Sequence, residues 1–174
     1  DTLTELPVVV LNSHTHYDHV GGNWQFDILW GRDTDFSRQR MQGLDHASVA
    51  EAVAEGWIWK PLPPGFKRET FTSKPWQFDR YVDEGMQIDL GGISLEVLFT
   101  PGHAPDCISL LDRHNRLLFT GDAFYLAPLY MHLDGGSFAQ YRASASRMAT
   151  YQSLVDELVT SHNVPLASSQ YLAE

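Results

Sequence analysis

The sequence has a single cysteine, Cys107, among its 174 residues. One thiol cannot form a disulfide within the chain, and it excludes a zinc finger or an iron–sulfur site built from the thiolates of one chain. The sequence also lacks an apolar run long enough to cross a membrane. Its first residues show no cationic stretch followed by an apolar one. We therefore predict no membrane partner, no signal peptide in this sequence and a cytoplasmic location.

Positive charge is scarce as well. Twelve Lys and Arg stand against 22 Asp and Glu, and the formal net charge of −10 would repel a nucleic-acid backbone. We therefore expect a small-molecule substrate and no nucleic acid. The composition, 43% hydrophobic and 20% charged, is that of a globular protein. A chain of this length buries roughly 70% of its unfolded surface. With no repeat or boundary in view, we expect a single domain over residues 1–174.

The hydrophobic pattern changes between strand and helix periods along the chain. Residues 7–11 (PVVVL) form a β-branched run, which predicts a strand buried on both faces. Two hairpins are expected later, one turning at Gly91–Gly92 and the other at residues 113–116. Helices are expected at residues 45–55 and from Phe138 onward. This mixture predicts an α/β fold.

An irregular segment, residues 57–78, separates the first helix from the hairpins. It holds four of the nine prolines and three of the five tryptophans. Such a segment is too rich in proline for a regular element and too aromatic for a linker. We expect it to pack over the domain, and the sequence leaves open whether it also lines a substrate pocket.

Three histidines fall within six residues: His14, His16 and His19, in NSHTHYDHVGG. They follow the first predicted strand, and the carboxyl ends of strands are where open α/β sheets place ligands. Neutral imidazole nitrogen suits Zn, Fe, Ni or Cu. With Asp18 the segment offers four ligands, more than one tetrahedral catalytic ion uses, since that ion must keep an open position. The spacing favours two metal ions.

The segment HTHYDH resembles the HxHxDH motif of the metallo-β-lactamase superfamily. Three later segments resemble further motifs of that family in the expected order: TPGH ending at His103, TGD ending at Asp122, and SHN around His162. The resemblance implies a four-layer αββα sandwich. Family members usually have several strands before HxHxDH, and this chain lacks them. We therefore expect either a fragment of a longer chain or a sheet whose amino-terminal half is absent or supplied by a partner. An exposed strand edge would follow, which favours a homo-oligomer or aggregation.

The resemblance also implies a role for each motif residue. Three histidines would hold a first ion, three side chains would hold a second, and Asp122 would bridge the two ions. We expect two Zn²⁺ per chain, with Fe or Mn as alternatives. Such ions activate a water and stabilise an oxyanion. Asp18 would be the catalytic residue that orients the nucleophile and moves its proton. The implied metal ligands are His14, His16 and His103 for the first ion and Asp18, His19 and His162 for the second, with Asp122 between them.

The predicted activity is hydrolysis of an ester-type carbonyl, in a thioester, a lactone or a similar small substrate with an apolar group. An acidic residue usually replaces His16 in the diiron oxygen-reducing branch of the family, and a cysteine replaces Asp122 in the commonest zinc β-lactamases. Two alternatives stay open. One is a metal-containing domain that binds a ligand or partner with little turnover, and the other is a β-lactam hydrolase.

Several further side chains have weaker claims to a function. The apolar segment after Asp122 offers Tyr125, Tyr130 and His132 as hydrogen-bond donors to a substrate carbonyl, and core aromatics with paired polar tips are an equal interpretation. Two histidines, His46 and His114, match no motif, and we expect both on the solvated surface.

Overall fold

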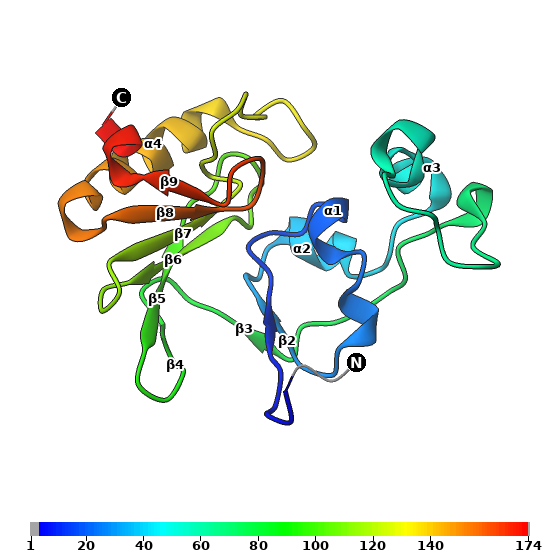
Figure 1. The fold of residues 1–174 in the computed structure, drawn as a ribbon, viewed down its shortest axis with the longest axis horizontal. Coiled ribbons are helices and arrows are strands. Elements are labelled where there is room, and N and C mark those ends of the chain that lie inside the picture. Colours follow the sequence, from blue (N-terminus) through cyan, green and yellow to red (C-terminus); the bar gives the residue numbers. More distant parts are fainter. Residues whose placement is uncertain (1–3, 174) are drawn as a thin grey trace.

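The computed structural model describes residues 4–173, which form two facing β-sheets (Figure 1). One sheet has six strands in the order β4-β5-β6-β7-β8-β9, and all its neighbours are antiparallel except the parallel pair β7 and β8. The other sheet is parallel, in the order β1-β2-β3. The strands are β1 Val10–Leu11, β2 Leu29–Gly31, β3 Arg80–Tyr81, β4 Gln87–Asp89, β5 Ser94–Phe99, β6 Ile108–Asp112, β7 Leu117–Gly121, β8 Glu157–Thr160 and β9 Leu166–Ser168.

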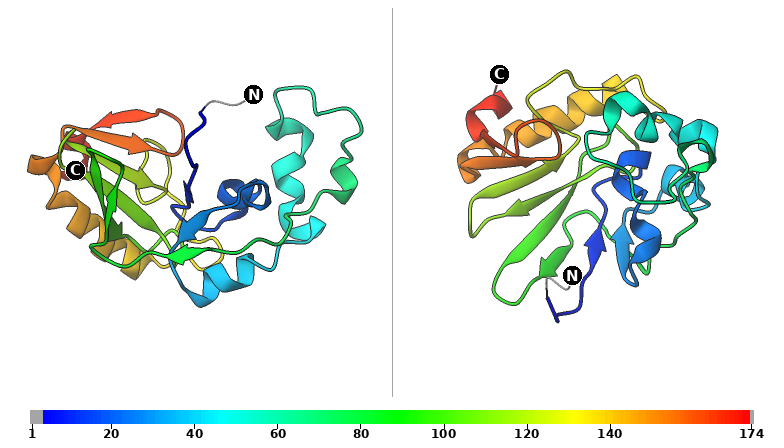
Figure 2. Two further views of the ribbon diagram at one scale, coloured as in Figure 1. Left: turned by 90° about the horizontal axis from the view of Figure 1, so that it is seen from below. Right: turned by 45° about the vertical axis from the view of Figure 1, so that its right-hand side comes forward.

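Helices cover the outer face of each sheet, which produces four layers (Figure 2). Helix α4 packs Met148 against Leu98 and Leu158 of the six-stranded sheet. On the other side, Val20 at the end of α1 packs with Leu29 of β2. The layered α/β architecture expected from the sequence is therefore confirmed. The helices are α1 Tyr17–Val20, α2 Asp35–Arg40, α3 His46–Val49 and α4 Phe138–Ala149, with short 3₁₀ turns at Asn23–Gln25, Ala50–Val53, Glu55–Trp57, Arg68–Thr70, Gln152–Leu154 and Ser169–Ala173.

The space between the sheets is filled by the alternate residues of the same strands. Val97 of β5 points inward and packs with Ile108, while its neighbour Leu98 points out toward α4. Partly buried Leu11 of β1 and Trp30 of β2 pack against this inner cluster. Because successive side chains of a strand point to opposite faces, β5 contributes to both cores, the one between the sheets and the one beneath α4.

Both predicted hairpins are present. At Gly91–Gly92 both residues have positive φ, and the Leu90 amide donates to the Ile93 carbonyl at 2.8 Å. In the second hairpin Asp112 pairs with Leu117, which leaves residues 113–116 as the turn. Helix α4 begins as expected, with the Ser137 side chain accepting from the Gln140 amide at the amino-terminal cap.

The prediction of a fully buried first strand was wrong. Only Val10 and Leu11 form β1, and Val8 and Val9 before it are exposed. The reason is that β1 pairs with β2 alone within the described residues, so it is the edge of a sheet. An exposed strand edge is thus present, and association of chains through it stays a prediction.

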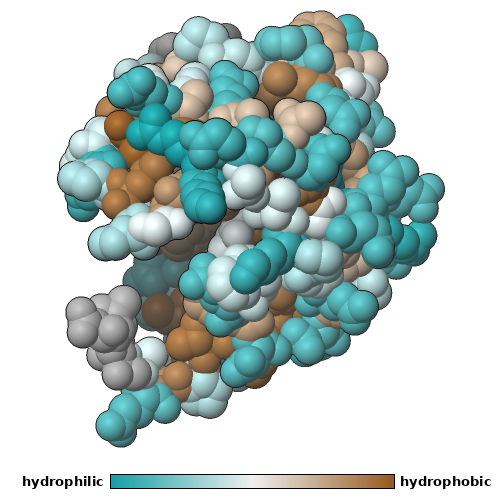
Figure 3. Space-filling model, turned by 90° about the vertical axis from the view of Figure 1, so that its right-hand side faces the viewer, coloured by the Kyte–Doolittle hydropathy of each residue, from teal (hydrophilic) through white to brown (hydrophobic). Residues whose placement is uncertain are grey.

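The segment between β2 and β3 also differs from expectation. The predicted helix at 45–55 is one turn, α3, followed by 3₁₀ turns, and together with the chain up to residue 74 it forms a lobe beside α1 (Figure 1). Trp57 and Trp59 are 70% and 84% exposed on this lobe, whereas Trp76 is buried in the core beneath β2. Figure 3 faces this side of the molecule, where hydrophilic side chains cover most of the surface and hydrophobic patches lie between them.

No helix within residues 4–173 is both long and apolar enough to pass through a lipid bilayer.

Candidate metal centre

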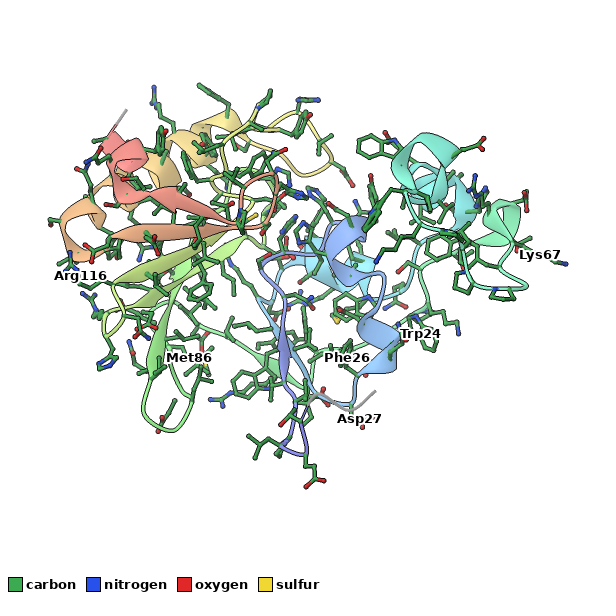
Figure 4. The ribbon with its side chains drawn as sticks, viewed as in Figure 1. Trp24, Phe26, Asp27, Lys67, Met86 and Arg116 are labelled. Atoms are coloured by element: carbon green, nitrogen blue, oxygen red, sulfur yellow. The ribbon has the colours of Figure 1, made fainter. Side chains whose placement is uncertain are left out.

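All seven candidate ligands lie beyond the carboxyl ends of strands, in loops or in the short helix α1. His14 and His16 follow the carboxyl end of β1, and α1 carries the next two candidates. The remaining three follow the carboxyl ends of β5, β7 and β8, strands that run in the same direction because β5 and β7 are both antiparallel to β6. Figure 4 labels Arg116, in the turn between β6 and β7, at the opposite edge of the sheet. The topology therefore gathers segments far apart in sequence.

The seven side chains form three overlapping groups whose ligand atoms lie within 4.8 Å of one another. His14 belongs to two groups and His19 also to two, so the groups make one continuous cluster. Two of the groups have the same members as the ligand sets that the resemblance implies, and the remaining group joins Asp122 to one histidine of each set. The groups are His14, His16 and His103; His14, His19 and Asp122; and Asp18, His19 and His162.

Asp122 lies at the centre of the cluster. Its Oδ2 atom is 3.4 Å from Nε2 of His103 and 3.1 Å from Nε2 of His162, and its Oδ1 atom is 3.4 Å from Nε2 of His19. Asp18 is on the outer side, with its Oδ2 atom 3.4 Å from Nε2 of His19 and 3.7 Å from Nε2 of His162. The buried carboxylate thus contacts both halves, while the more exposed Asp18 faces one half.

Neighbouring groups orient the rings of the first half. Nδ1 of His14 is 3.2 Å from the Ser13 hydroxyl, and Nδ1 of His103 donates to the Tyr130 carbonyl at 2.7 Å. For His16 the order is reversed, since Nε2 donates to the Asp134 carbonyl at 3.1 Å. The two contacts to carbonyls leave the other ring nitrogen of His103 and of His16 with a free lone pair, which is how outer partners prepare histidine for a metal.

Within residues 4–173, three buried polar atoms of the cluster make no hydrogen bond of normal geometry: Nε2 of His14, Nε2 of His19 and Oδ1 of Asp122. The last two face each other at 3.4 Å as an ion pair, whereas Nε2 of His14 has no such partner. Buried polar atoms are normally paired, because leaving one unpaired costs about 1–3 kcal/mol. These atoms are imidazole nitrogens and a carboxylate oxygen, which are common ligands of transition-metal ions in proteins. The donor set therefore fits a metal centre.

The two halves differ in charge. Burial lowers the pKa values of His14, His16 and His103, so these rings are neutral near pH 7. Burial acts in the same direction on His19, but the carboxylates of Asp122 and Asp18 outweigh it and raise its pKa to about 9. The first half thus presents neutral imidazoles, and the second half holds a cation between two carboxylates.

For both carboxylates burial is the largest influence, and it raises the pKa. The imidazole neighbours, His19 first among them, more than compensate, so the pKa values of Asp18 and Asp122 are lowered. Both groups are therefore anionic near pH 7. Anionic oxygen is the form that coordinates a metal ion.

Two glycines allow the ligand loops to approach other elements closely. Gly102, before His103, has φ of +146°, and a Cβ there would lie 2.3 Å from Cα of Tyr141. Gly121, before Asp122, has φ of +52°, and a Cβ there would lie 2.9 Å from Cβ of Ser13. Larger residues would displace the candidate ligands that follow.

Sequence reasoning missed a buried carboxyl group beside the cluster. Thr15, which separates His14 from His16, donates to Oδ2 of Asp106 at 2.7 Å. Asp106 is fully buried, and burial raises its pKa. The signal available in the sequence was an acidic residue three positions after His103 in an otherwise apolar segment.

The three predicted substrate residues occupy different positions. Tyr125 is buried, with its ring 5.2 Å from that of His162. Tyr130 and His132 are exposed and contact each other edge-to-face, with ring centroids 5.6 Å apart. Tyr130 contacts the cluster through its backbone carbonyl, a role that residue type does not predict.

The two histidines outside the motifs are outside the cluster as well. His114 is exposed in the β6–β7 turn, as expected. The expectation of a solvated His46 was wrong, because the lobe folds back over it. Its ring is half-buried, and Nδ1 lies 3.0 Å from the Phe71 carbonyl.

The family model of the metallo-beta-lactamase superfamily matches residues 42–162. The chain belongs to this superfamily. The matched range contains the segments around His103, Asp122 and His162, while the HTHYDH segment at residues 14–19 precedes it. The assignment of residues 14–19 to the first motif therefore rests on its sequence and on the position of its side chains in the cluster.

Curated relatives support the same family. Acyl-coenzyme A thioesterase MBLAC2 of Gallus gallus is 27% identical over 158 residues, which cover 90% of this chain and 56% of that protein. Hydroxyacylglutathione hydrolase GloC of Haemophilus influenzae is 28% identical over 117 residues, covering 67% of this chain and 50% of that protein. The chain thus spans about half the length of these relatives.

Solved structures share the fold. TTHA1623, crystallised in a di-iron-bound form, has a TM-score of 0.69 at 24% identity, covering 97% of this chain and 76% of that one. The BLEG-1 B3 metallo-beta-lactamase has a TM-score of 0.65 at 20% identity, covering 94% and 72%. At these identities the likeness concerns the fold alone.

Proposed function

We propose that the chain provides the metal centre of a hydrolase that attacks an ester-type carbonyl, a thioester first among the candidates. The observation that carries the proposal is the convergence of seven ligand side chains on one cluster, three of them with buried atoms that make no hydrogen bond of normal geometry within the described residues. His14, His16 and His103 would hold one divalent ion, and Asp18, His19 and His162 the other, with Asp122 between them. Zinc suits this mixed nitrogen and oxygen set, and iron or manganese are the alternatives.

Two such ions, when bound, lower the pKa of a water toward ~7 and polarise a carbonyl oxygen. The protein's own contribution is orientation and proton transfer. Asp18 is the more exposed carboxylate of the cluster, and its lowered pKa keeps it able to accept a proton. We assign it the role of orienting the attacking water and passing a proton to the leaving group.

The substrate proposal has two supports. One is the relationship to a protein named acyl-coenzyme A thioesterase. The other is the loop after β7, whose Leu126, Tyr130 and Leu133 expose apolar surface while its backbone contacts His103 and His16. An acyl group attached to the carbonyl under attack would meet these side chains.

A substrate panel tests the proposal. We would assay protein purified without chelator on an acyl-coenzyme A, an acyl-glutathione, a lactone, an aryl ester and a β-lactam, before and after metal removal. The proposal expects thioester hydrolysis that chelation abolishes and added Zn²⁺ restores. If metal-loaded protein hydrolyses no substrate of the panel, the alternative of a metal-containing binding domain is favoured. A preference for the β-lactam would favour a lactamase.

A further inference from the structure

One loop, residues 130–134, faces two candidate ligands with its backbone. The Tyr130 carbonyl accepts from His103 and the Asp134 carbonyl accepts from His16. A carbonyl is an acceptor only, so each contacted nitrogen must carry the ring proton. The position of this loop therefore determines where the free nitrogens of both rings point.

An ion pair fastens this loop to α2. The carboxylate of Asp134 pairs with the guanidinium of Arg40, the last residue of that helix. The same guanidinium lies over the Phe36 ring, 4.7 Å from its centroid, and the Phe36 ring packs edge-on against His16 at 5.5 Å. Asp134 is thus held through its side chain by Arg40, while its backbone holds His16.

Arg40 differs from the other arginine of the same helix. Its side chain is 18% exposed, whereas that of Arg38 is 54% exposed and pairs with Asp33 and Asp35. Among the described residues, Nε of Arg40 is also buried without a hydrogen-bond partner. Its partner Asp134 is 76% exposed, and ion pairs with exposed partners contribute little stability, so stability alone does not explain the burial of Arg40.

We propose that Arg40 is a positioning residue of the metal centre, whose ion pair with Asp134 holds the 130–134 loop where its carbonyls aim the rings of His16 and His103. The inference rests on the proposed metal centre and adds to it a residue that binds no metal itself. Changes to the partners of metal-bound histidines typically weaken metal binding by about 10–100-fold. We expect a loss in this range for the first ion in Arg40→Ala, and less for the second ion.

The test is a titration of metal-free protein with Zn²⁺ against a chromophoric chelator, repeated with Co²⁺, whose visible absorption reports ligand geometry. Arg40→Ala and Asp134→Asn should both weaken the first ion by about tenfold or more and alter the Co²⁺ spectrum. Asp134→Asn keeps the backbone carbonyl, so its effect isolates the ion pair. The double variant should lose no more than either single one.

Arg40→Lys keeps the charge without the planar fork, so it should recover part of the affinity. Arg38→Ala is the matched control, and it should leave affinity and spectrum unchanged. Wild-type affinity and spectrum in Arg40→Ala and Asp134→Asn would overturn the inference. The inference would also be overturned if the variants bound both ions equally weakly and the metal-free protein had a lower Tm, because that combination indicates general destabilisation. If wild-type protein binds no metal, both the proposed function and this inference are wrong. If wild-type protein binds two ions and Arg40→Ala binds both equally well, only the inference about Arg40 is wrong.

Discussion

Nδ1 of His16 and Nε2 of His103 lie 2.8 Å apart, although 87 positions separate the two residues in the sequence. The other nitrogen of each ring donates to a backbone carbonyl of the 130–134 loop. Two facing nitrogens with free lone pairs repel each other unless a cation lies between them. This pair therefore marks the point where the first metal ion is expected.

Metal analysis of wild-type protein purified without chelator should find close to two transition-metal ions per chain, with zinc the main species. His103→Ala should reduce the content to about one ion, because the first group loses one of its three imidazoles. The measurement is elemental analysis by mass spectrometry. His114→Ala, at an exposed turn, is the control and should keep both ions. A wild-type content near one would contradict the two-ion centre.

Asp18→Ala should reduce hydrolysis more than His162→Ala, because Asp18 is proposed both to bind the second ion and to move a proton. We expect a loss of roughly 100-fold or more in kcat/KM for Asp18→Ala, the usual effect of losing an acid–base group. Activity and metal content would be measured on the same samples. Near-normal activity of fully metal-loaded Asp18→Ala would rule out the assigned role.

Filling of the second site should release a proton at pH 7. His19 has its pKa raised from 6.5 to about 9 in the metal-free fold, so an ion must displace its proton. The same raised pKa stabilises the metal-free fold fully below pH 6.5, and this contribution is lost as the pH rises through about 9. An indicator dye in weak buffer would follow the release, which should fade above pH 9.

Binding at the first site provides the internal control for that experiment. The pKa values of its three histidines are lowered, so at pH 7 they have no proton to give up. Proton release of equal size at both steps would contradict the different charge states of the two halves.

Gly102→Ala should destabilise the fold by roughly 3 kcal/mol or more, since its Cβ meets the Tyr141 backbone and its φ is positive. Gly65→Ala is the matched control, because Gly65 has φ of +81° and open space around its Cβ position. It should cost only about 1 kcal/mol. Urea unfolding of metal-free protein would compare the two, and equal costs would contradict the close approach of α4 to the His103 loop.

The length of the acyl group should affect the rate. Across a series of thioesters, kcat/KM should rise up to several-fold with each added methylene until the apolar surface is covered, because each buried methylene contributes about 0.8 kcal/mol. Leu133→Asp on the exposed loop should flatten the series. If wild-type protein shows no dependence on acyl length, or prefers charged acyl groups, the proposed apolar contact is wrong. The proposal of a metal-dependent hydrolase is not affected by that result.

Much of the fold and of the candidate site could be predicted from local sequence. The Gly91–Gly92 turn needs two residues that tolerate positive φ, and α4 needs Ser137 as a cap before a helical period, so both depend on near neighbours. Residue type and spacing also singled out the cluster of His14, His16, Asp18 and His19 as a candidate metal site. The other three candidate ligands were predicted because their short motifs resemble those of the metallo-β-lactamase superfamily.

Tertiary structure alone decided how those residues are supported. Trp57 and Trp76 are the same residue type in one segment, yet one is exposed and the other is in the core, since burial depends on what packs above each of them. The partners of His16 make the same point. Its ring is aimed by the backbone of Asp134, 118 positions away, and a carbonyl looks alike at every position in the sequence. Only the folded chain brings that carbonyl, and the Arg40 ion pair behind it, to the candidate metal ligands.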